Sequence, residues 1–171
     1  MRLNYISLRQ STSEDEPFLL ALRRVTMDEH LRRVGEPTDD AVHLARIRYR
    51  ASDVQIVLWA SVPIGLLKYF EGPREWVIVQ VQILPAYQGQ GISKQLLTEC
   101  LARADLAEVA VSLTVLKGNK AINLYRRLGF NIVMDSGNSF KMKRERQTFR
   151  TGDVSADIRT GSETGAPNRA E

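Results

Sequence analysis

A loop with two glycines, between a predicted strand and a predicted helix, is the segment whose chemistry is clearest. Gly89 and Gly91 follow a β-branched run that ends at Leu84, and an amphipathic pattern begins at Ile92. Glycine lets the backbone turn sharply and approach a ligand without a Cβ in the way. The first N–H groups of a helix lack partners within it, and the helix dipole favours an anion there. The pattern predicts a phosphate site, although two glycines alone equally suit a tight turn.

Neither of the two best-known phosphate loops fits this segment. A Walker loop requires Gly-Lys-Ser/Thr after a four-residue gap, which is absent here. A dinucleotide loop requires a third glycine three positions after the second, where this chain has Lys94.

Two motifs resemble those of the GNAT acetyltransferase superfamily. The first resembles its acetyl-CoA signature, Gln/Arg-x-x-Gly-x-Gly/Ala, with Gln88, Gly91 and Ser93 in the defined positions and serine replacing the last glycine or alanine. The second, at residues 119–130, resembles the Asn-x-Ala-x-x-Leu-Tyr-x-x-x-Gly-Phe segment of these enzymes. Their order, separation and strand–helix context make the resemblance specific, and it extends from about residue 54 to residue 142.

The resemblance implies acetyl-CoA as cosubstrate, without a metal. The pantetheine would lie along the strand before the loop, where an N–H of Ile83 or Leu84 would polarise the thioester carbonyl. Asn119 would either bond the pantetheine arm or cap its helix, and both roles stay open. The residues assigned to the cofactor are Ile83, Leu84, Gln88, Gly89, Gln90, Gly91, Ile92, Ser93 and Asn119.

The resemblance also assigns Tyr125 to catalysis, as the donor that protonates the departing thiolate. The alternative is a tyrosine of the core, because Tyr125 shares an apolar helix face with Ala121 and Leu128. The sequence alone does not decide between the proton donor and the core residue.

The general base is harder to assign. Many relatives use a carboxylate on the central strand, but here Gln80 and Gln82 share that face and would position a water instead. The alternative is a partly solvated strand face. Alternation puts Glu75 on the opposite face. Glu29 and His30 lie near the end of the first helix, in the region that usually lines the acceptor site.

A cluster of acids near the connection between the first two helices suggests a negative rim that attracts a cationic amine, or simply helix caps and solvated charge. The cluster comprises Asp28, Glu29, Glu36, Asp39 and Asp40.

The expected function is therefore N-acetyl transfer from acetyl-CoA to a primary amine, by direct attack in a ternary complex. The acceptor could be a small molecule, a peptide or a protein. The alternative is a GNAT-like module that senses acetyl-CoA and catalyses nothing. Homodimers are common among the proteins this chain resembles, and the sequence leaves the oligomeric state open.

The elements that must position these residues follow from hydrophobic periodicity. Strands are predicted at residues 3–8, 54–60, 63–70, 76–84, 109–116, 130–134 and 139–142, and helices at 13–33, from 39, at 92–104 and at 119–128. This order predicts an α/β (α+β) fold of the GNAT type, with a mixed sheet of about seven strands and helices on both faces. Residues 1–143 would form the domain, and the polar segment 144–171 a disordered tail.

Composition excludes several other classes. The single cysteine, Cys100, cannot form an intramolecular disulfide, and no paired Cys or His spacing predicts a metal site. No apolar run approaches the ~20 residues of a membrane span, and the first residues lack a signal-peptide pattern, so we expect a cytoplasmic protein. The net charge of +4 arises from basic residues without a groove-reading motif, which argues against nucleic-acid binding.

Overall fold

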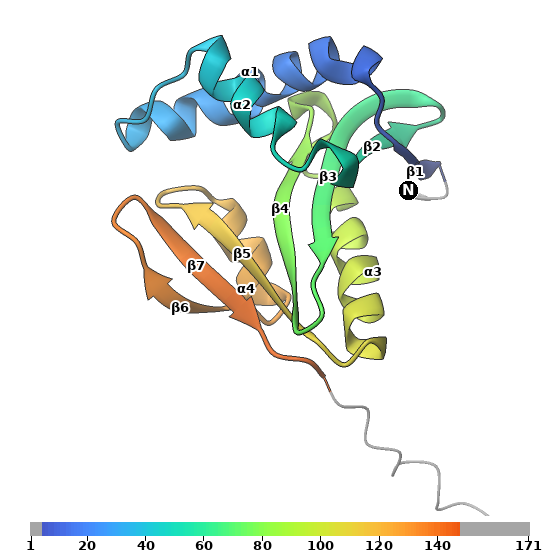
Figure 1. Ribbon diagram of the computed structural model, residues 1–171, viewed down its shortest axis with the longest axis vertical. Coiled ribbons are helices and arrows are strands. Elements are labelled where there is room, and N and C mark those ends of the chain that lie inside the picture. Colours follow the sequence, from blue (N-terminus) through green and yellow to red (C-terminus); the bar gives the residue numbers. More distant parts are fainter. Residues whose placement is uncertain (1–4, 148–171) are drawn as a thin grey trace, which may run out of the picture.

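The seven predicted strands form one mixed sheet in the computed structural model, which describes residues 5–147 (Figure 1). The strands are β1 Ile6–Gln10, β2 Val54–Trp59, β3 Val62–Glu71, β4 Glu75–Ile83, β5 Ala110–Leu116, β6 Asn131–Asp135 and β7 Ser139–Arg144. The helices are α1 Glu16–Arg33, α2 Asp40–Arg48, α3 Ile92–Leu106 and α4 Ala121–Arg127. The strand order is β1-β2-β3-β4-β5-β7-β6, which confirms the predicted fold class.

Two hydrophobic cores hold the helices on opposite faces of the sheet. On one face α1 and α2 pack through Leu22 and Ile47, both almost fully buried. On the other face α3 and α4 contribute Leu97, Cys100 and Tyr125. The buried Cys100 thiol has its pKa raised to about 11 by burial, as expected of a core residue.

The central strands β4 and β5 separate halfway along their length. Their parallel pairing runs only from Glu75 opposite Ala110 to Ile78 opposite Leu113. Beyond that point residues 79–83 of β4 have no partner on the β5 side, and Figure 1 shows the two strands diverging toward α1. An opening lined by unpaired backbone therefore lies at the end of β4 that leads into the glycine loop.

A β-bulge in β4 changes which side chains share a face. The register with β3 shifts between Lys68 and Tyr69, so that Val79 has no residue opposite it. Because a bulge resets the alternation, Glu75 shares a face with Gln80, and the predicted opposite placement is wrong. Glu75 still lies about 16 Å along the strand from Gln80, too far to serve the same site.

The domain extends past its predicted end. Arg144, assigned to the tail from the sequence, is the last residue of β7 and is buried. Its guanidinium donates two hydrogen bonds, each of 2.8 Å, to the carboxylate of Asp105 at the end of α3. The rest of the predicted tail, from residue 148, lies outside the described residues. Among residues 5–147 no helix is long and apolar enough to cross a membrane.

Candidate functional site

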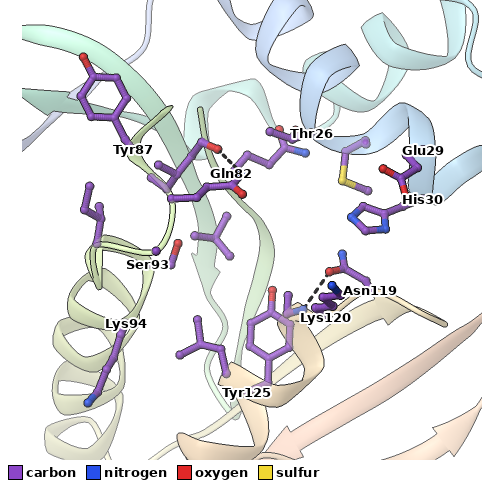
Figure 2. Close-up of a pocket in the computed structure, with 18 of the residues that line it drawn as sticks. Thr26, Glu29, His30, Gln82, Tyr87, Ser93, Lys94, Asn119, Lys120 and Tyr125 are labelled. Carbon is purple, nitrogen blue, oxygen red and sulfur yellow. Dashed lines mark hydrogen bonds between the residues drawn. The ribbon is translucent and has the colours of Figure 1, made fainter. Parts of the chain in front are cut away.

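A cavity of about 680 Å³ lies where β4 and β5 diverge, between the glycine loop, α4 and the end of α1 (Figure 2). It brings together the two sequence motifs, which are some thirty residues apart in the chain. Most of the predicted site residues line it: Gln82, Ile83, Gln88, Gly89, Gly91, Ile92, Ser93, Asn119 and Tyr125. Gln80, Leu84 and Gln90 do not line it.

The glycine loop has the conformation that its sequence predicts. Gly89 and Gly91 have φ of 74° and 82°, a region that favours glycine, and no heavy atom would lie within 4 Å of a Cβ at either position. Gly91 is the residue before α3, so the unbonded N–H groups of Ile92 and Ser93 lie beside the cavity. The Gln88 side chain donates to the Ile83 carbonyl at 2.8 Å and so braces the loop.

The backbone of β4 narrows the choice of oxyanion donor. The Leu84 N–H already donates to the Ile64 carbonyl at 2.8 Å. The prediction that it could donate to the thioester oxyanion is therefore wrong. In an antiparallel pair the N–H groups alternate between the two sides of the strand. The N–H groups of Ile83 and Val81 therefore point away from β3, toward the opening. Sequence alternation alone missed Val81, because only the register with β3 shows which edge each N–H faces.

The two strand glutamines are buried, not partly solvated. Gln80 is 7% and Gln82 is 6% exposed. Only Gln82 lines the cavity, and its Oε1 has no hydrogen-bond partner within residues 5–147. Gln90 is half-buried, and its side chain donates to the Ala86 carbonyl at 3.3 Å, away from the cavity.

The position of Tyr125 is compatible with both of its alternative roles. Its ring is in the core, packed edge-on against Phe130 with 6.1 Å between ring centroids. Its hydroxyl points into the cavity in Figure 2. Burial raises the pKa of Tyr125 to about 12, so the hydroxyl remains protonated at neutral pH and can donate a hydrogen bond or a proton.

The two roles considered for Asn119 use different atoms. Its Oδ1 accepts a hydrogen bond at 2.9 Å from the N–H of Ala121, the first residue of α4, but the N-cap position is Lys120, so the predicted N-cap assignment is wrong by one residue. Its Nδ2 takes no part in that bond, and the residue lines the cavity. This contact therefore leaves the amide N–H groups for a ligand.

The end of α1 forms the wall opposite α4, with His30 and Glu29 facing the cavity. Arg33 donates to Glu29 at 2.7 Å and lies 3.2 Å from Nδ1 of His30. Burial, with the Arg33 charge, lowers the pKa of His30, so the ring is neutral at neutral pH. Because arginine can only donate, Nδ1 is the acceptor and Nε2 carries the proton. His30 thus presents a donor, and a role as general base would require this contact with Arg33 to break.

Three basic residues of the cavity were missed from the sequence: Lys94, Lys120 and Arg127. All three are exposed, and none forms an ion pair with a carboxylate of the described part of the chain. Lys94 could have been found, because it lies in the first helical turn after the glycines. Together they give the cavity mouth a positive charge suited to phosphates.

Three of the five acids in the predicted rim are paired with basic side chains, and the other two accept hydrogen bonds from neutral donors. Asp28 is bonded to Arg32 and His43, Glu29 to Arg33, and Asp40 to Arg24. Asp39 accepts from the Val42 N–H as the cap of α2, and Glu36 accepts from Asn138. These contacts favour the structural reading of the cluster. In residues 5–147 no group of three His, Cys, Asp or Glu side chains could hold a metal ion.

Comparison with known proteins gives one family and many similar folds. The model of the acetyltransferase (GNAT) domain matches residues 52–132. No curated protein matches the sequence.

Three similar solved structures illustrate the fold. The PaiA N-acetyltransferase from Thermoplasma acidophilum, in complex with coenzyme A, is 18% identical, with a TM-score of 0.64 over 82% of this chain and 98% of that one. Arabidopsis thaliana Naa50, in complex with the bisubstrate analogue CoA-Ac-MVNAL, is 17% identical, with a TM-score of 0.61 over 82% of this chain and 99% of that one. The ribosomal-protein-S18-alanine N-acetyltransferase from Escherichia coli is 16% identical, with a TM-score of 0.62 over 85% of this chain and 97% of that one. At these identities the likeness shows a shared fold.

Proposed function

We propose that this chain, which carries a GNAT acetyltransferase domain and has the GNAT fold, transfers an acetyl group from acetyl-CoA to a primary amine. The observation that carries the proposal is the convergence of three features in one cavity. These are the unpaired backbone of β4, the glycine loop before α3 and the Tyr125 hydroxyl.

The residues present fit acetyl-CoA. The N–H groups from Gly89 to Ser93 form a concave set of donors at a helix start, which suits a pyrophosphate. Lys94, Lys120 and Arg127 add positive charge at the same mouth. The unpaired edge of β4 offers hydrogen bonds to the amides of a pantetheine arm, and the Asn119 amide offers another.

The reaction needs three functions from the chain's own residues. The N–H of Val81 or Ile83 would donate to the thioester carbonyl oxygen as negative charge develops on it. The Oε1 of Gln82, buried and unpartnered in the described residues, would accept a hydrogen bond from the amine or from a water that takes its proton. Tyr125 would donate to the sulfur as it leaves, since a free thiol has a pKa of ~8.5. The amine would attack directly in a ternary complex.

The acceptor is proposed as a primary amine of a small molecule, a peptide or a protein. A peptide or protein amine has support from the Naa50 complex, whose bisubstrate analogue joins coenzyme A to a peptide, and from the ribosomal-protein-S18-alanine enzyme. Both are proteins of the same fold.

One observation favours a second candidate, a module that binds acetyl-CoA without turnover. Glu29 is the only carboxylate on the described cavity wall, and it is exposed and paired with Arg33. A site without a positioned base could bind the cofactor as a sensor.

The two candidates separate in one experiment. The protein is titrated with acetyl-CoA by calorimetry and then incubated with acetyl-CoA and a panel of amino acids, polyamines and short peptides. Thiol release and the mass of the acetylated product are measured, with Tyr125→Phe as the impaired variant and Tyr49→Phe, at an exposed position, as its control. Turnover supports transfer, binding without turnover supports the sensor, and absence of acetyl-CoA binding would reject both.

A further inference from the structure

A buried arginine without a partner lies one helical turn from the cavity. Arg23 is on α1, three and four residues before Thr26 and Met27, which line the cavity wall. Side chains at this spacing share a helix face. Arg23 is only 6% exposed, yet its Nε has no hydrogen-bond partner among the described residues.

The other arginine buried within residues 5–147, whose Nε is likewise without a partner, differs in having a carboxylate beside it. Arg144, 5% exposed, forms a two-pronged pair with Asp105 at 2.8 Å. Arg23 has no such carboxylate within residues 5–147. A buried charge left without a partner is costly, so its retention needs a reason.

The surroundings of Arg23 increase the excess of positive charge. Burial, and after it the charge of Arg46, lowers the pKa of Arg23 to about 10, whereas Asp28 opposes them only as the smallest contribution. Asp28 is already bonded to His43 and Arg32. Arg23 therefore remains protonated at neutral pH, and the acid that acts on its pKa, Asp28, is already bonded to other side chains.

Lys68 adds positive charge near Arg23 but has no N–H left to donate to a ligand. Its Nζ donates to the carbonyls of Arg46, Ile47 and Tyr49 at 3.0, 3.1 and 2.7 Å, which uses all three of its protons. The charges of Arg46 and Arg23, after burial, lower the pKa of Lys68. This places Lys68 close to Arg23.

Gln80 provides the second donor group. It pairs with Lys68 across β3 and β4, on the face that α1 and α2 cover. It is 7% exposed, and both its Nε2 and its Oε1 lack partners among residues 5–147. A guanidinium fork and one amide N–H₂ match a planar group with two oxygens and a single negative charge.

We propose that Arg23, together with the amide of Gln80, binds a carboxylate carried by the acceptor amine. This inference rests on the proposed acetyl transfer and names the class of acceptor: amines that bear a carboxylate near the reacting nitrogen. Gln82, two residues along β4 and on the same face, would then hold the amine end of that acceptor at the cavity. The carboxylate could be that of a free amino acid or an acidic side chain at the start of a peptide.

The test compares amines in matched pairs, one member with the carboxylate and one with its amide, and rates are compared per neutral amine because amidation also lowers the pKa of the amine. Alanine and alaninamide form the first pair. Two peptides with an amidated C-terminus, one beginning with Asp and one with Asn, form the second, which separates the two sources of the carboxylate. Thiol release gives kcat/KM for each amine with the native protein, Arg23→Gln, Arg23→Lys and Arg24→Gln. The last is the control, because Arg24 is the adjacent residue, is exposed and is paired with Asp40.

We expect the native protein to prefer the carboxylate in at least one pair by about 10- to 150-fold, the range of a charge-assisted hydrogen bond. Arg23→Gln should remove the preference by lowering kcat/KM for the carboxylate member of the pair to that for the amide. Arg23→Lys should restore part of it, and Arg24→Gln should retain it. Equal rates within both pairs for the native protein, or a preference that survives in Arg23→Gln, would overturn the inference while leaving acetyl transfer intact.

A second readout does not depend on turnover. If acetyl-CoA binds but no amine reacts, the same pairs are titrated into the protein saturated with coenzyme A, and affinity is measured by chemical-shift changes. Selective binding of the carboxylate member, lost in Arg23→Gln, supports the site, and equal or absent binding of both members rejects it. Thermal unfolding checks the fold: Arg23→Gln should unfold close to the native temperature, because it removes a buried unpaired charge and breaks no described hydrogen bond or ion pair.

Discussion

Three glycines allow the role of the loop in binding to be separated from its role in folding. Gly89, Gly91 and Gly137 all have positive φ, of 74°, 82° and 74°, and a Cβ at any of them would meet no heavy atom within 4 Å. Alanine at each position therefore costs only the backbone strain of the left-handed conformation, about 1 to 2 kcal/mol. Gly89 and Gly91 line the cavity, whereas Gly137 lies in the turn between β6 and β7.

The three variants should thus lose similar stability but differ in binding. For a domain of this size each should unfold about 2 to 8 °C lower than the native protein. At Gly89 and Gly91 the added Cβ would occupy the space through which the backbone N–H groups approach the pyrophosphate. Loss of one charge-assisted hydrogen bond, about 1.5 to 3 kcal/mol, corresponds to roughly 10- to 150-fold weaker binding of acetyl-CoA.

The assay is calorimetric titration with acetyl-CoA at one fixed ionic strength, paired with thermal unfolding of each variant. Gly137→Ala should bind acetyl-CoA like the native protein despite its lower melting temperature. The reasoning is refuted if Gly137→Ala loses as much affinity as the loop variants, since strain and not the cavity would then explain the loss. Native affinity in both Gly89→Ala and Gly91→Ala would refute it equally.

Three further predictions concern other parts of the chain. Gly65→Ala should lower the free energy of unfolding by about 1 to 3 kcal/mol in urea titration, because its Cβ would lie 2.3 Å from the Gln82 carbonyl oxygen, which cannot move without separating β3 from β4. Tyr125→Phe should lower kcat by about 100-fold with little change in acetyl-CoA affinity, and equal kcat in stopped-flow assays would exclude the hydroxyl as proton donor. Asp15→Asn should cost about 1 to 2 kcal/mol at pH 7, because the Arg9 guanidinium lowers the pKa of Asp15 from 3.8 to about 2. Since the lowered pKa belongs to the folded state, this difference in unfolding free energy should be complete above about pH 4 and vanish as the pH falls through about 2, and a constant difference across that range would contradict the assignment.

Most residues predicted for the site line one cavity because the signals that place them are local. The glycines of the loop, the helix that starts at Ile92 and the apolar face of α4 each depend on residues within a few positions of one another. Backbone conformation and helical periodicity are properties of such short segments. The buried face of α3, from Leu96 to Ala104, was predictable for the same reason.

Three of the errors involve partners that are distant in the chain. Leu84 was unavailable as a donor because Ile64, on β3, already accepts from its N–H. Glu75 changed face because Val79 bulges against the register of β3. Arg144 belonged to the domain because Asp105, on α3, holds it. None of these contacts leaves a pattern in the nearby sequence.

The sequence by itself determined the elements, their order and the motif that marks a phosphate loop, since each rests on local propensity and on spacing along the chain. Tertiary structure alone decided which N–H groups of β4 remain unbonded, where Gln80 and Gln82 lie, and that Arg23 is buried without a carboxylate. The physical reason is that hydrogen-bond satisfaction and burial depend on every neighbour in space. Those neighbours are determined by strand register, by the bulge in β4 and by the divergence of β4 from β5.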